Sequence, residues 1–512
     1  MGQLYILPLH PTTTCHQRLA LPPVPLLAMS SSSETLPLFE HDDPSTMVPN
    51  TSEFPMPERI LTLRPSWLSS SSSSSSPSSP SLRRPCVVVS RAEMGRRRML
   101  RRRQKATAEC ISDEALIHLK SYKYSSVDKS PVSKYVLGPW WNFFVELLPL
   151  WIAPNMVTLL GFFFILGNIG LLIIYMPDLV GPGPSWLYFS FAFGLFMYQT
   201  MDNVDGKQAR RTGTSSGLGE LFDHGIDSLN CTLASLLETA AMGLGTSPAG
   251  IFTALCPCLP MFFSTWETYH THTLYLGVFN GPTEGLLIAC AIMILSGIYG
   301  PGIYTQPLAD LFGESLPGLR HWLGQTTFRD IWVAIIAISL VVGHIPFCVL
   351  NVAQARRKRN QPVLPVFLEW TPMAVFTVCI GAWLFSPYST LMSENHLVLF
   401  CLTMSFVFGR FTTKMILAHL TRQPFPYWTV MLTPLVGGAI IGNLPRFGLP
   451  QISPTAELYY LWAYLAFSLV VYFRWAYLVI TSICNFLGIN ALTIPKEKQL
   501  ANKQARDATK LH

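Results

Sequence analysis

Four aspartates lie close together in one short polar stretch of a largely apolar chain. The stretch holds Asp202, Asp205, Asp223 and Asp227, with His224 among them. An ionised carboxylate at membrane depth costs about 3 kcal/mol unless a cation neutralises it. Oxygen-only ligand sets favour Mg2+ or Mn2+ over Zn2+. The stretch therefore predicts a site for one or two hard divalent cations.

The spacing of these residues predicts two helical faces. Two sets share the spacing i, i+3, i+4 and i+7, which keeps side chains on one side of a helix. The first set is Asp202, Asp205, Gly206 and Ala209, and the second is Glu220, Asp223, His224 and Asp227. We expect two helices to face each other through these sets, with Gly206, Ala209 and Gly219 leaving room for a ligand.

Neighbouring basic residues offer an alternative to a metal. Lys207, Arg210 and Arg211 lie beside the first two aspartates and could form buried salt bridges with the acids. Three cations do not satisfy four acids in so regular an array, and we therefore favour the metal site.

The composition of the whole chain predicts an all-α, polytopic membrane protein. The 512 residues are 50% hydrophobic and 13% charged, and the mean hydropathy is +0.34. Such a chain is too apolar for an ordinary soluble enzyme, and it has segments long enough to cross a bilayer. Ten transmembrane helices are expected, over residues 155–176, 185–200, 228–244, 251–265, 286–299, 331–352, 366–385, 397–420, 428–441 and 458–483.

Elements outside these spans place the polar stretch at one membrane surface. Residues 132–151 mix aromatic with charged side chains, which is typical of a helix lying in the interface. Threading the spans alternately gathers most basic residues on one side, and the positive-inside rule makes that side cytosolic, together with both termini. These residues are Lys207, Arg210, Arg211, Arg356, Arg357, Lys358, Arg359, Arg422 and those after Pro495, against Arg320, Arg329 and Arg446 on the other side. The acidic stretch then faces the cytosol.

Residues 1–107 form an extension of different composition. It contains the serine tract from Ser69 to Ser76 and 13 Lys/Arg against 7 Asp/Glu, without apolar periodicity. Such a segment cannot bury enough surface to fold, so we expect a disordered, solvated tail without a nucleic-acid partner. The expected organisation is this extension, a transmembrane domain over 115–490 with a catalytic core at about 132–300, and a cytosolic tail over 491–512.

The polar stretch resembles the signature of a known family. The matching positions share residue type and spacing without a gap, and they are Asp202, Asp205, Gly206, Ala209, Arg210, Gly219, Asp223 and Asp227. This pattern is similar to that of the CDP-alcohol phosphotransferases. The flanking words D-G-K-Q-A-R-R-T, G-E-L-F-D-H-G and N-G-P-T-E-G resemble the eukaryotic choline and ethanolamine phosphotransferase branch. The resemblance covers residues 115–490.

The resemblance implies an enzyme of phospholipid biosynthesis. Members of this branch transfer phosphocholine or phosphoethanolamine from CDP-choline or CDP-ethanolamine to diacylglycerol. The products are phosphatidylcholine or phosphatidylethanolamine, and CMP. Members are multi-pass proteins of the endoplasmic reticulum and Golgi membranes, often homodimeric, and they require Mg2+ or Mn2+, for which we expect two ions per site.

The same resemblance assigns roles to the polar residues. The implied metal ligands are Asp202, Asp205, Asp223 and Asp227, and the implied substrate-binding residues are Asn155, Gly206, Ala209, Arg210 and Gly219. Arg210 would clamp phosphate oxygens or the nucleotide, because its fixed fork suits phosphate better than a lysine does. The other four would line the nucleotide pocket.

The proton of the lipid hydroxyl needs an acceptor, and two residues are candidates. Asp227 is the family's fourth carboxylate, whereas an imidazole such as that of His224 has an ordinary pKa of about 6.5, which suits a base at neutral pH. We favour His224 as the base, with Glu220 one turn earlier orienting it and Asp227 mainly binding metal.

The choice between choline and ethanolamine is left open. A quaternary ammonium favours aromatic faces, and Tyr198, Trp266 and Tyr269 are available for that purpose. A second group either reads the amino alcohol or lies at a wet helix end, namely Glu267, His270, His272 and Glu284. Arg410 and Lys414 are expected to snorkel or to contact lipid headgroups.

Two other functions compete with this interpretation. A CDP-diacylglycerol-dependent phosphatidyltransferase shares the signature, but such enzymes are generally shorter, and the flanking words argue against it. A transporter or lipid scaffold would use the acidic site for ion coupling. That function predicts internal repeats, which we do not find, and gives no reason for Arg210 and the glycines at fixed offsets.

Overall fold

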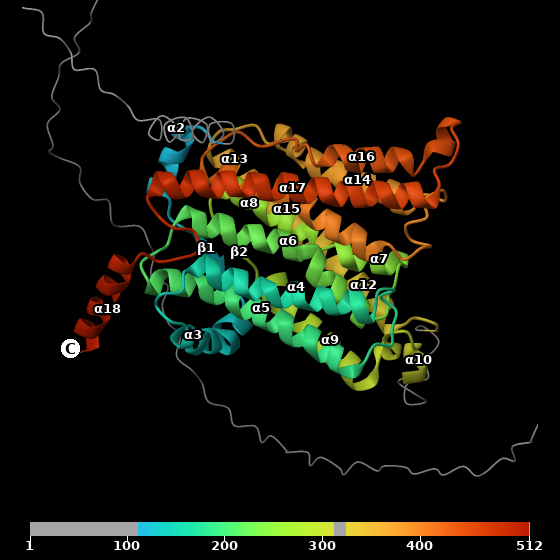
Figure 1. The fold of residues 1–512 in the computed structure, drawn as a ribbon, viewed down its shortest axis with the longest axis horizontal. Helices are drawn as coiled ribbons and strands as arrows, with labels where there is room; N and C mark the ends of the chain where they lie inside the picture. The colour runs from blue at the N-terminus through green and yellow to red at the C-terminus, as the bar shows by residue number, and fades with distance from the viewer. Residues whose placement is uncertain (1–110, 312–323, 511–512) are drawn as a thin grey trace, which may run out of the picture. The chain divides into compact units, whose positions relative to one another are not determined.

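The computed structural model describes residues 111–311 and 324–510 (Figure 1). The described residues all belong to one compact unit of the chain. The tail expected over residues 1–107 therefore lies outside the described residues.

Helices of different lengths lie side by side in this unit (Figure 1). They are α4 (Pro154–Tyr175), α5 (Ser185–Arg211), α6 (Gly217–Ala241), α7 (Pro248–Leu255), α8 (Cys258–Thr271), α9 (Leu286–Tyr299), α12 (Phe328–Ile338), η6 (Ser339–His344), α13 (Ile345–Lys358), η7 (Leu364–Trp370), α14 (Thr371–Leu384), α15 (Leu397–Leu420), α16 (Leu432–Ile441) and α17 (Pro454–Leu487). The predicted helical fold class is confirmed.

Further elements connect or flank these helices. They are α2 (Asp113–Leu116), η1 (Ile117–Ser121), β1 (Ser126–Asp128), η2 (Ser133–Leu137), α3 (Gly138–Leu147), β2 (Leu274–Leu276), η3 (Gly281–Gly285), η4 (Pro301–Tyr304), α10 (Leu308–Leu311), η8 (Leu444–Phe447) and α18 (Lys496–Lys510). The helix expected over residues 132–151 is thus present as η2 followed by α3.

The count of spans is lower than the ten expected. Over 111–311 and 324–510, seven helical segments are long and apolar enough to cross a membrane, and they contain α4, α7–α8, η3–α9, α12–α13, η7–α14, α15 and α17. Helices α5 and α6 are long enough, with 27 and 25 residues, but they carry the polar stretch. Helix α16 has only 10 residues. The protein is therefore a multi-pass helical membrane protein, with seven candidate spans among the described residues.

Helices α5 and α6 are joined by a tight turn that the sequence specifies. Gly213 has a φ of +60°, which a side chain would make unfavourable. Ser216 then caps α6, because its side chain accepts a hydrogen bond from the backbone N–H of Gly219. The turn reverses the chain, so that the end of α5 and the start of α6 lie together.

Helix α6 lies at the centre of the bundle. It packs against α4, α9 and α15, and Leu236, Leu237, Ala240 and Ala241 on its second half are fully buried. Residues 228–241 are buried at every position except Cys231 and Glu238, so this half of the helix has neighbours on nearly all sides. The apolar half therefore anchors the polar first half of α6 in a fixed position.

Hydrogen bonds and an ion pair connect helix α3 to the end of α5. Lys207 donates a hydrogen bond of 2.9 Å to Asn142, and Arg211 forms an ion pair of 3.0 Å with Glu146. Arg211 also donates to the carbonyl oxygens of Val145 and Leu148, at 2.6 and 2.8 Å. The two basic side chains that flank the polar stretch are thus engaged with α3.

A segment over residues 122–130, which we call the strap, crosses from the start of α6 to the start of η3. Tyr122 packs beside Gly217, the first residue of α6. In its middle, β1 pairs in parallel with β2, and Ser125 bonds to Thr273 at 3.1 Å. At its end Ser130 donates a hydrogen bond to Glu284 in η3.

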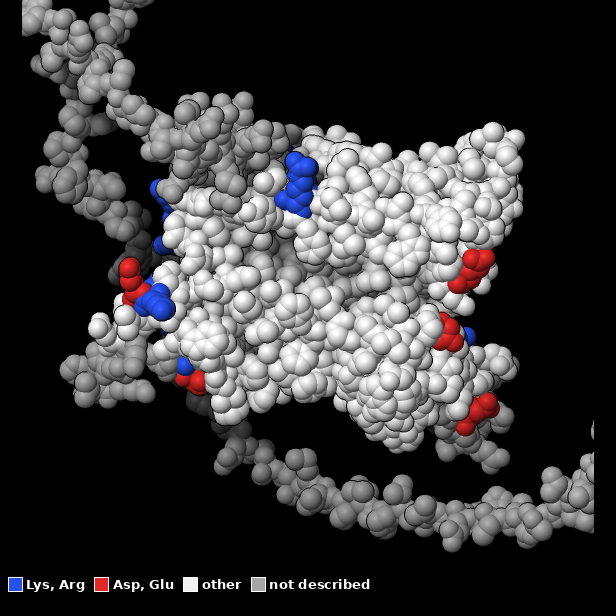
Figure 2. Space-filling model, viewed as in Figure 1, with Lys and Arg blue, Asp and Glu red and all other residues white. Residues whose placement is uncertain are grey.

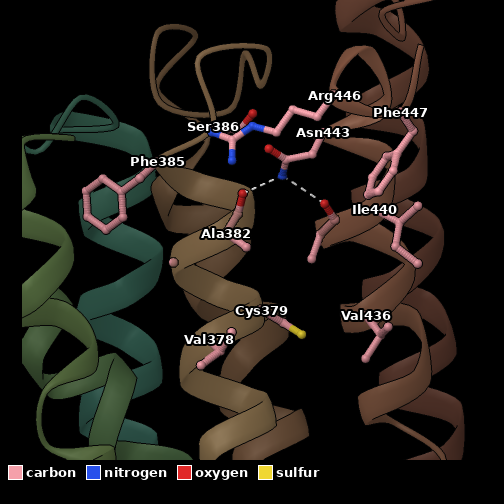
Figure 3. A pocket seen from close by; sticks show the side chains of 12 residues that line it. Val378, Cys379, Ala382, Phe385, Ser386, Val436, Ile440, Asn443, Arg446 and Phe447 are labelled. Atoms are coloured by element: carbon pink, nitrogen blue, oxygen red, sulfur yellow. Dashed lines mark hydrogen bonds between the residues drawn. The ribbon is translucent and has the colours of Figure 1, made fainter. Parts of the chain in front are cut away.

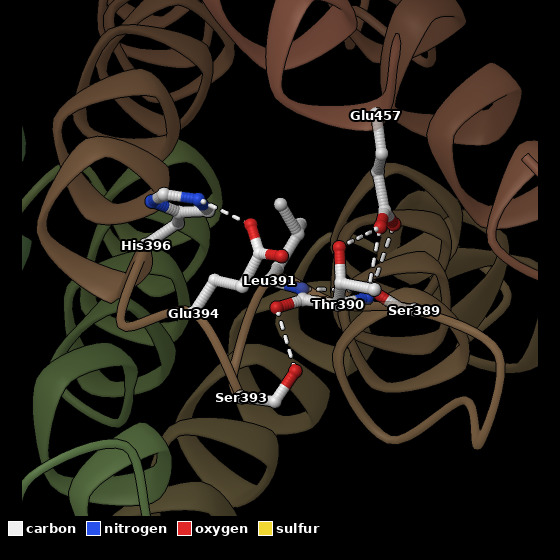
Figure 4. A network of polar contacts seen from close by, with 7 residues as sticks. All are labelled: Ser389, Thr390, Leu391, Ser393, Glu394, His396 and Glu457. Carbon is white, nitrogen blue, oxygen red and sulfur yellow. Dashed lines mark hydrogen bonds and ion pairs between the residues drawn. The ribbon is translucent and has the colours of Figure 1, made fainter. Parts of the chain in front are cut away.

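At the other end of the bundle, one buried glutamate ties together the start of α17 and the loop before α15 (Figure 4). Glu457 is fully buried and accepts hydrogen bonds from Trp383 and Ser389, at 2.8 and 2.7 Å. It also accepts from the backbone N–H of Thr390 at 2.8 Å and from its hydroxyl at 3.0 Å. These bonds satisfy a carboxylate whose burial would otherwise be costly.

Charged side chains on the visible face gather near the two ends of the long helices (Figure 2). Apart from one basic patch, the band between them is uncharged. This distribution is the one expected for helices whose middle sections lie in hydrocarbon.

Candidate metal centre

The four predicted aspartates converge between the end of α5 and the start of α6. Ligand atoms of Asp223, His224 and Asp227 all lie within 4.8 Å of one another. The carboxyl groups of Asp202 and Asp205 lie close enough to those of Asp223 and Asp227 to interact with them electrostatically. The helical spacing therefore predicted this meeting correctly.

Two carboxylate oxygens in this cluster are buried and lack a hydrogen-bond partner among the described residues. They are Oδ1 of Asp202 and Oδ1 of Asp223. Leaving a charged acceptor unsatisfied costs about 3 kcal/mol or more. A hard divalent cation would satisfy both oxygens and offset the repulsion between the carboxylates, and so the donor set fits Mg2+ or Mn2+.

Salt bridges do not explain the cluster. Lys207 and Arg211 contact α3 instead. Within the described ranges, no ion pair joins any of the four aspartates to a lysine or arginine. The structure thus favours the metal over the alternative in which neighbouring cations neutralise the acids.

Two hydroxyl groups orient the outer carboxylates. Thr158 on α4 donates a hydrogen bond to Oδ2 of Asp205. Tyr198 on α5 is buried and donates one to Oδ1 of Asp227. Each bond fixes one oxygen of its carboxylate and leaves the other for a ligand. The hydroxyl of Tyr198 is thereby engaged, and a role of its ring in binding choline stays a prediction.

The predicted substrate-binding residues lie around the same centre. Asn155 is buried near Gly219 and donates a hydrogen bond of 3.0 Å to the carbonyl oxygen of Ala491. A side chain built at Gly206 would meet the guanidinium of Arg210 at 3.6 Å. Arg210 is exposed and therefore lies over Gly206 at the solvent side of the cluster. Ala209, on the same helix, is partly buried.

The roles proposed for His224 and Glu220 differ in how far the geometry supports them. His224 lies within the carboxylate cluster. Glu220 is buried, and its Oε2 has no hydrogen-bond partner among the described residues. No hydrogen bond between Glu220 and His224 is present in the described part of the chain, so the orienting role of Glu220 stays a prediction.

The candidate headgroup residues are mostly engaged within the protein. His270 and Trp266 both contact Oε2 of Glu369, at 2.6 and 2.8 Å. Glu267 accepts a hydrogen bond of 2.6 Å from Asn351. These contacts tie α8 to η7 and α13, which is a packing role.

Of the remaining headgroup candidates, two form hydrogen bonds within the protein and one is exposed. Tyr269 donates to the carbonyl oxygen of Gln423 at 2.9 Å, and Glu284 accepts from the backbone N–H of Asn280 at 2.9 Å. His272 is exposed and stacks on His419, with ring centroids 5.1 Å apart.

The two basic residues of α15 are also engaged within the protein. The Arg410 guanidinium lies 3.7 Å from the ring centroid of Trp475. Lys414 donates to the carbonyl oxygen of Trp428 at 3.0 Å.

Tyr124 on the strap was missed by sequence analysis. The pKa of Tyr124 is raised to about 12 by desolvation, and the charges of Asp223, Asp202 and Asp205 act in the same direction. Tyr124 is half-exposed, and its phenol is a hydrogen-bond donor at neutral pH. No sequence signal indicates this position, because the strap has no periodicity and lies far from the polar stretch along the chain.

Comparison with known proteins points to the same part of the chain. Residues 151–300 match the family model described as CDP-alcohol phosphatidyltransferase. Choline/ethanolaminephosphotransferase 2 of Arabidopsis thaliana is 37% identical over 76% of this chain and 99% of its own length. Choline/ethanolaminephosphotransferase 1 and cholinephosphotransferase 1 of Saccharomyces cerevisiae are 34% and 35% identical, again over 76% of this chain, and over 98% and 99% of their own lengths.

Proposed function

The chain belongs to the CDP-alcohol phosphatidyltransferase family, and we infer its reaction from that family membership. It is an enzyme that transfers phosphocholine or phosphoethanolamine from the corresponding CDP-alcohol to diacylglycerol. The products are phosphatidylcholine or phosphatidylethanolamine, and CMP. The observation that carries this function is the convergence of four carboxylates with two buried oxygens that lack partners.

The reaction forms one phosphorus–oxygen bond and breaks another. The diacylglycerol hydroxyl attacks the phosphorus that carries the amino alcohol, and CMP leaves with the bridging oxygen. A bound divalent cation supplies charge neutralisation on the diphosphate, which phosphoryl transfer needs more than covalent chemistry. We assign Asp202, Asp205, Asp223 and Asp227 as the residues that would hold one or two such ions.

The other polar residues orient the donor. Arg210 lies at the solvent side of the cluster, where its guanidinium would bind phosphate oxygens in a bidentate manner. We assign Asn155, Gly206, Ala209 and Gly219 to the nucleotide pocket. Their place beside the cluster supports this assignment.

We assign the base for the lipid hydroxyl to His224, with Asp227 as the alternative. Tyr198 already donates a hydrogen bond to Asp227, and a carboxylate stabilised in this way is a weaker proton acceptor. The position of His224 within 4.8 Å of both Asp223 and Asp227 supports its role near the reacting atoms.

We place the reaction at the cytosolic surface of the endoplasmic reticulum or Golgi membrane. The distribution of basic residues supports this orientation. Ten spans would result if α5, α6 and α16 also cross, and a homodimer is the expected assembly. The relatives match 76% of this chain over nearly their whole length, which supports placing the activity in residues 115–490.

A transfer assay tests the function. The purified full chain with Mg2+ and diacylglycerol receives radiolabelled CDP-choline or CDP-ethanolamine in separate reactions, and CDP-diacylglycerol with inositol in a third. Metal-dependent phospholipid from either of the first two supports the proposal and settles the headgroup. Product only in the third reaction would assign the chain to the phosphatidyltransferases, and no product in any would contradict enzyme function.

A further inference from the structure

A groove of about 700 Å³ lies between α14 and α16, on the outer surface of the bundle (Figure 3). Among its lining residues, Val378, Phe385, Ile440 and Phe447 have exposed side chains. The groove is therefore open to the surroundings of the bundle, which are lipid along the apolar part of both helices.

The shape of the groove follows from close packing on its inner side. The indole of Trp383 lies against Gly438 and Gly442, where a side chain would clash with it. This contact brings α14 and α16 together. On the outer side, Gly381 and Ala439 line the groove, and their small size leaves space between the two helices. These small residues leave space between the larger apolar side chains of Val378, Val436 and Ile440, and a hydrocarbon chain could occupy that space.

The end of the groove differs from its floor in being polar. Arg446 reaches across this end toward Ser386, above Asn443 (Figure 3). The amide nitrogen of Asn443 donates to the carbonyl oxygens of Ala382 and Ala439, at 2.7 and 2.9 Å. These two hydrogen bonds hold the Asn443 amide between α14 and α16.

The guanidinium of Arg446 has no acidic partner among the described residues. No ion pair in the described ranges includes Arg446, and no aspartate or glutamate lines the groove. A guanidinium next to an apolar slot, where two helices end, is complementary to a phosphate that carries acyl chains. Such a group is abundant at the depth where membrane helices end.

We propose that this groove binds one glycerophospholipid, with its phosphate on Arg446 and an acyl chain along Val378, Cys379, Val436 and Ile440. A second copy of the chain is the other candidate occupant. A twofold interface pairs a surface with itself, so the partner would bring a second Arg446 and no acid from this groove. Charge complementarity therefore favours the lipid.

The groove is separate from the metal centre. Glu457 lies at the groove end of α17, where it bonds to Trp383, whereas Ile483 of the same helix packs with Leu218 and Leu221 at the start of α6. The rise along a helix between positions 457 and 483 is about 40 Å. The bound lipid is therefore neither the acceptor nor the product at the reaction site.

Photolabelling of the full chain in lipid vesicles tests the proposal. The probe is a phosphatidylcholine with a diazirine on one acyl chain, in dioleoylphosphatidylcholine vesicles, and adducts are mapped by mass spectrometry. We expect adducts on Val378, Cys379, Val436 or Ile440. Arg446→Ala should lower this labelling about tenfold, which is the loss of one charge-assisted contact. Ala439→Phe should also lower it, because the ring would fill the slot.

Matched controls separate the outcomes. Arg329→Ala removes a basic residue near the start of α12 that does not line the groove, and it should leave groove labelling unchanged. A diazirine diacylglycerol with the same acyl chains should label the groove weakly, because it lacks phosphate. Equal labelling by both probes, or no effect of Arg446→Ala, would overturn the proposal. So would cross-links between α14 of one copy and α16 of another without lipid adducts.

Discussion

The hydroxyl of Tyr198 on α5 donates a hydrogen bond of 2.5 Å to Oδ1 of Asp227 on α6. The bond joins the two helices that carry the metal centre and holds one oxygen of the carboxylate. A carboxylate oxygen of Asp227 lies within 4.8 Å of ligand atoms of Asp223 and His224. Tyr198 is thus a positioning residue that acts through Asp227.

Tyr198→Phe should lower turnover about tenfold and raise the Mg2+ concentration needed for half-maximal activity. A hydrogen bond to a charged group contributes about 1.5–3 kcal/mol, and its loss frees the Asp227 carboxylate to rotate. Tyr188→Phe is the matched control, because Tyr188 is buried on the same helix but its hydroxyl accepts from the N–H of Gly183. Identical Mg2+ dependence of the two variants would rule out the positioning role.

Asp223→Asn should abolish turnover, by about a thousandfold or more, and leave the protein folded. Its Oδ1 is one of the two buried oxygens without a partner, and a neutral amide would weaken the hold on a divalent cation. Asp178→Asn is the control, since Asp178 only accepts a hydrogen bond from Val180 at 3.2 Å in a loop. Activity retained by purified Asp223→Asn would argue against metal at this cluster.

Removal of divalent cations by chelation should stop the reaction, and Mg2+ or Mn2+ should restore it. Ca2+ should restore it poorly, because it prefers longer bonds and more ligands than a compact carboxylate cluster provides. The measurement is transfer of radiolabel at controlled free-ion concentrations, together with thermal unfolding of the protein. Unchanged activity after complete chelation would disprove the metal requirement.

His224→Ala should lose turnover but still bind CDP-alcohol in the presence of Mg2+, if His224 accepts the proton of the lipid hydroxyl. Single-turnover transfer and calorimetric binding separate the two effects. His118→Ala, which changes a histidine of η1, is the control for loss of an imidazole. Near-normal turnover of His224→Ala would transfer the role of base to Asp227.

Glu457→Gln should lower the free energy of unfolding by about 2 kcal/mol, because the neutral amide accepts fewer of the four hydrogen bonds that converge on it. Glu394→Gln is the control. Glu394 is half-exposed and pairs with His396 at 3.3 Å, and such surface pairs contribute little (Figure 4). Thermal unfolding in detergent measures both variants, and equal midpoints would contradict the prediction.

The metal centre could be predicted from the sequence because its geometry is local. Helical periodicity alone places Asp202 with Asp205, and Asp223 with Asp227, and a short turn then brings the two helices together. The groups that orient these carboxylates could be predicted only in part. Thr158 lies 47 positions from Asp205 along the chain, so no periodicity connects them.

Seven of the ten expected spans coincide with helices long and apolar enough to cross a membrane, and the other three stay predictions. The expected 397–420 coincides with α15, because its apolar residues outweigh Arg410 and Lys414 over the length of the helix. Helices α5 and α6 extend beyond their apolar parts into the polar stretch, and their mean hydropathy is therefore too low to identify them as spans. Distant contacts such as Trp266 with Glu369, 103 positions apart, depend on tertiary packing that no local pattern encodes.

Trp383, Gly438 and Gly442 also constrain how this chain can change over evolutionary time. The indole occupies the space in which a side chain at either glycine would lie. A mutation that enlarges one glycine is tolerated only after the indole has been replaced by something smaller, and a smaller residue alone leaves a void. Variants of this protein should therefore accumulate substitutions at the three positions jointly, in a restricted order, while the neighbouring lipid-facing Val378 drifts freely.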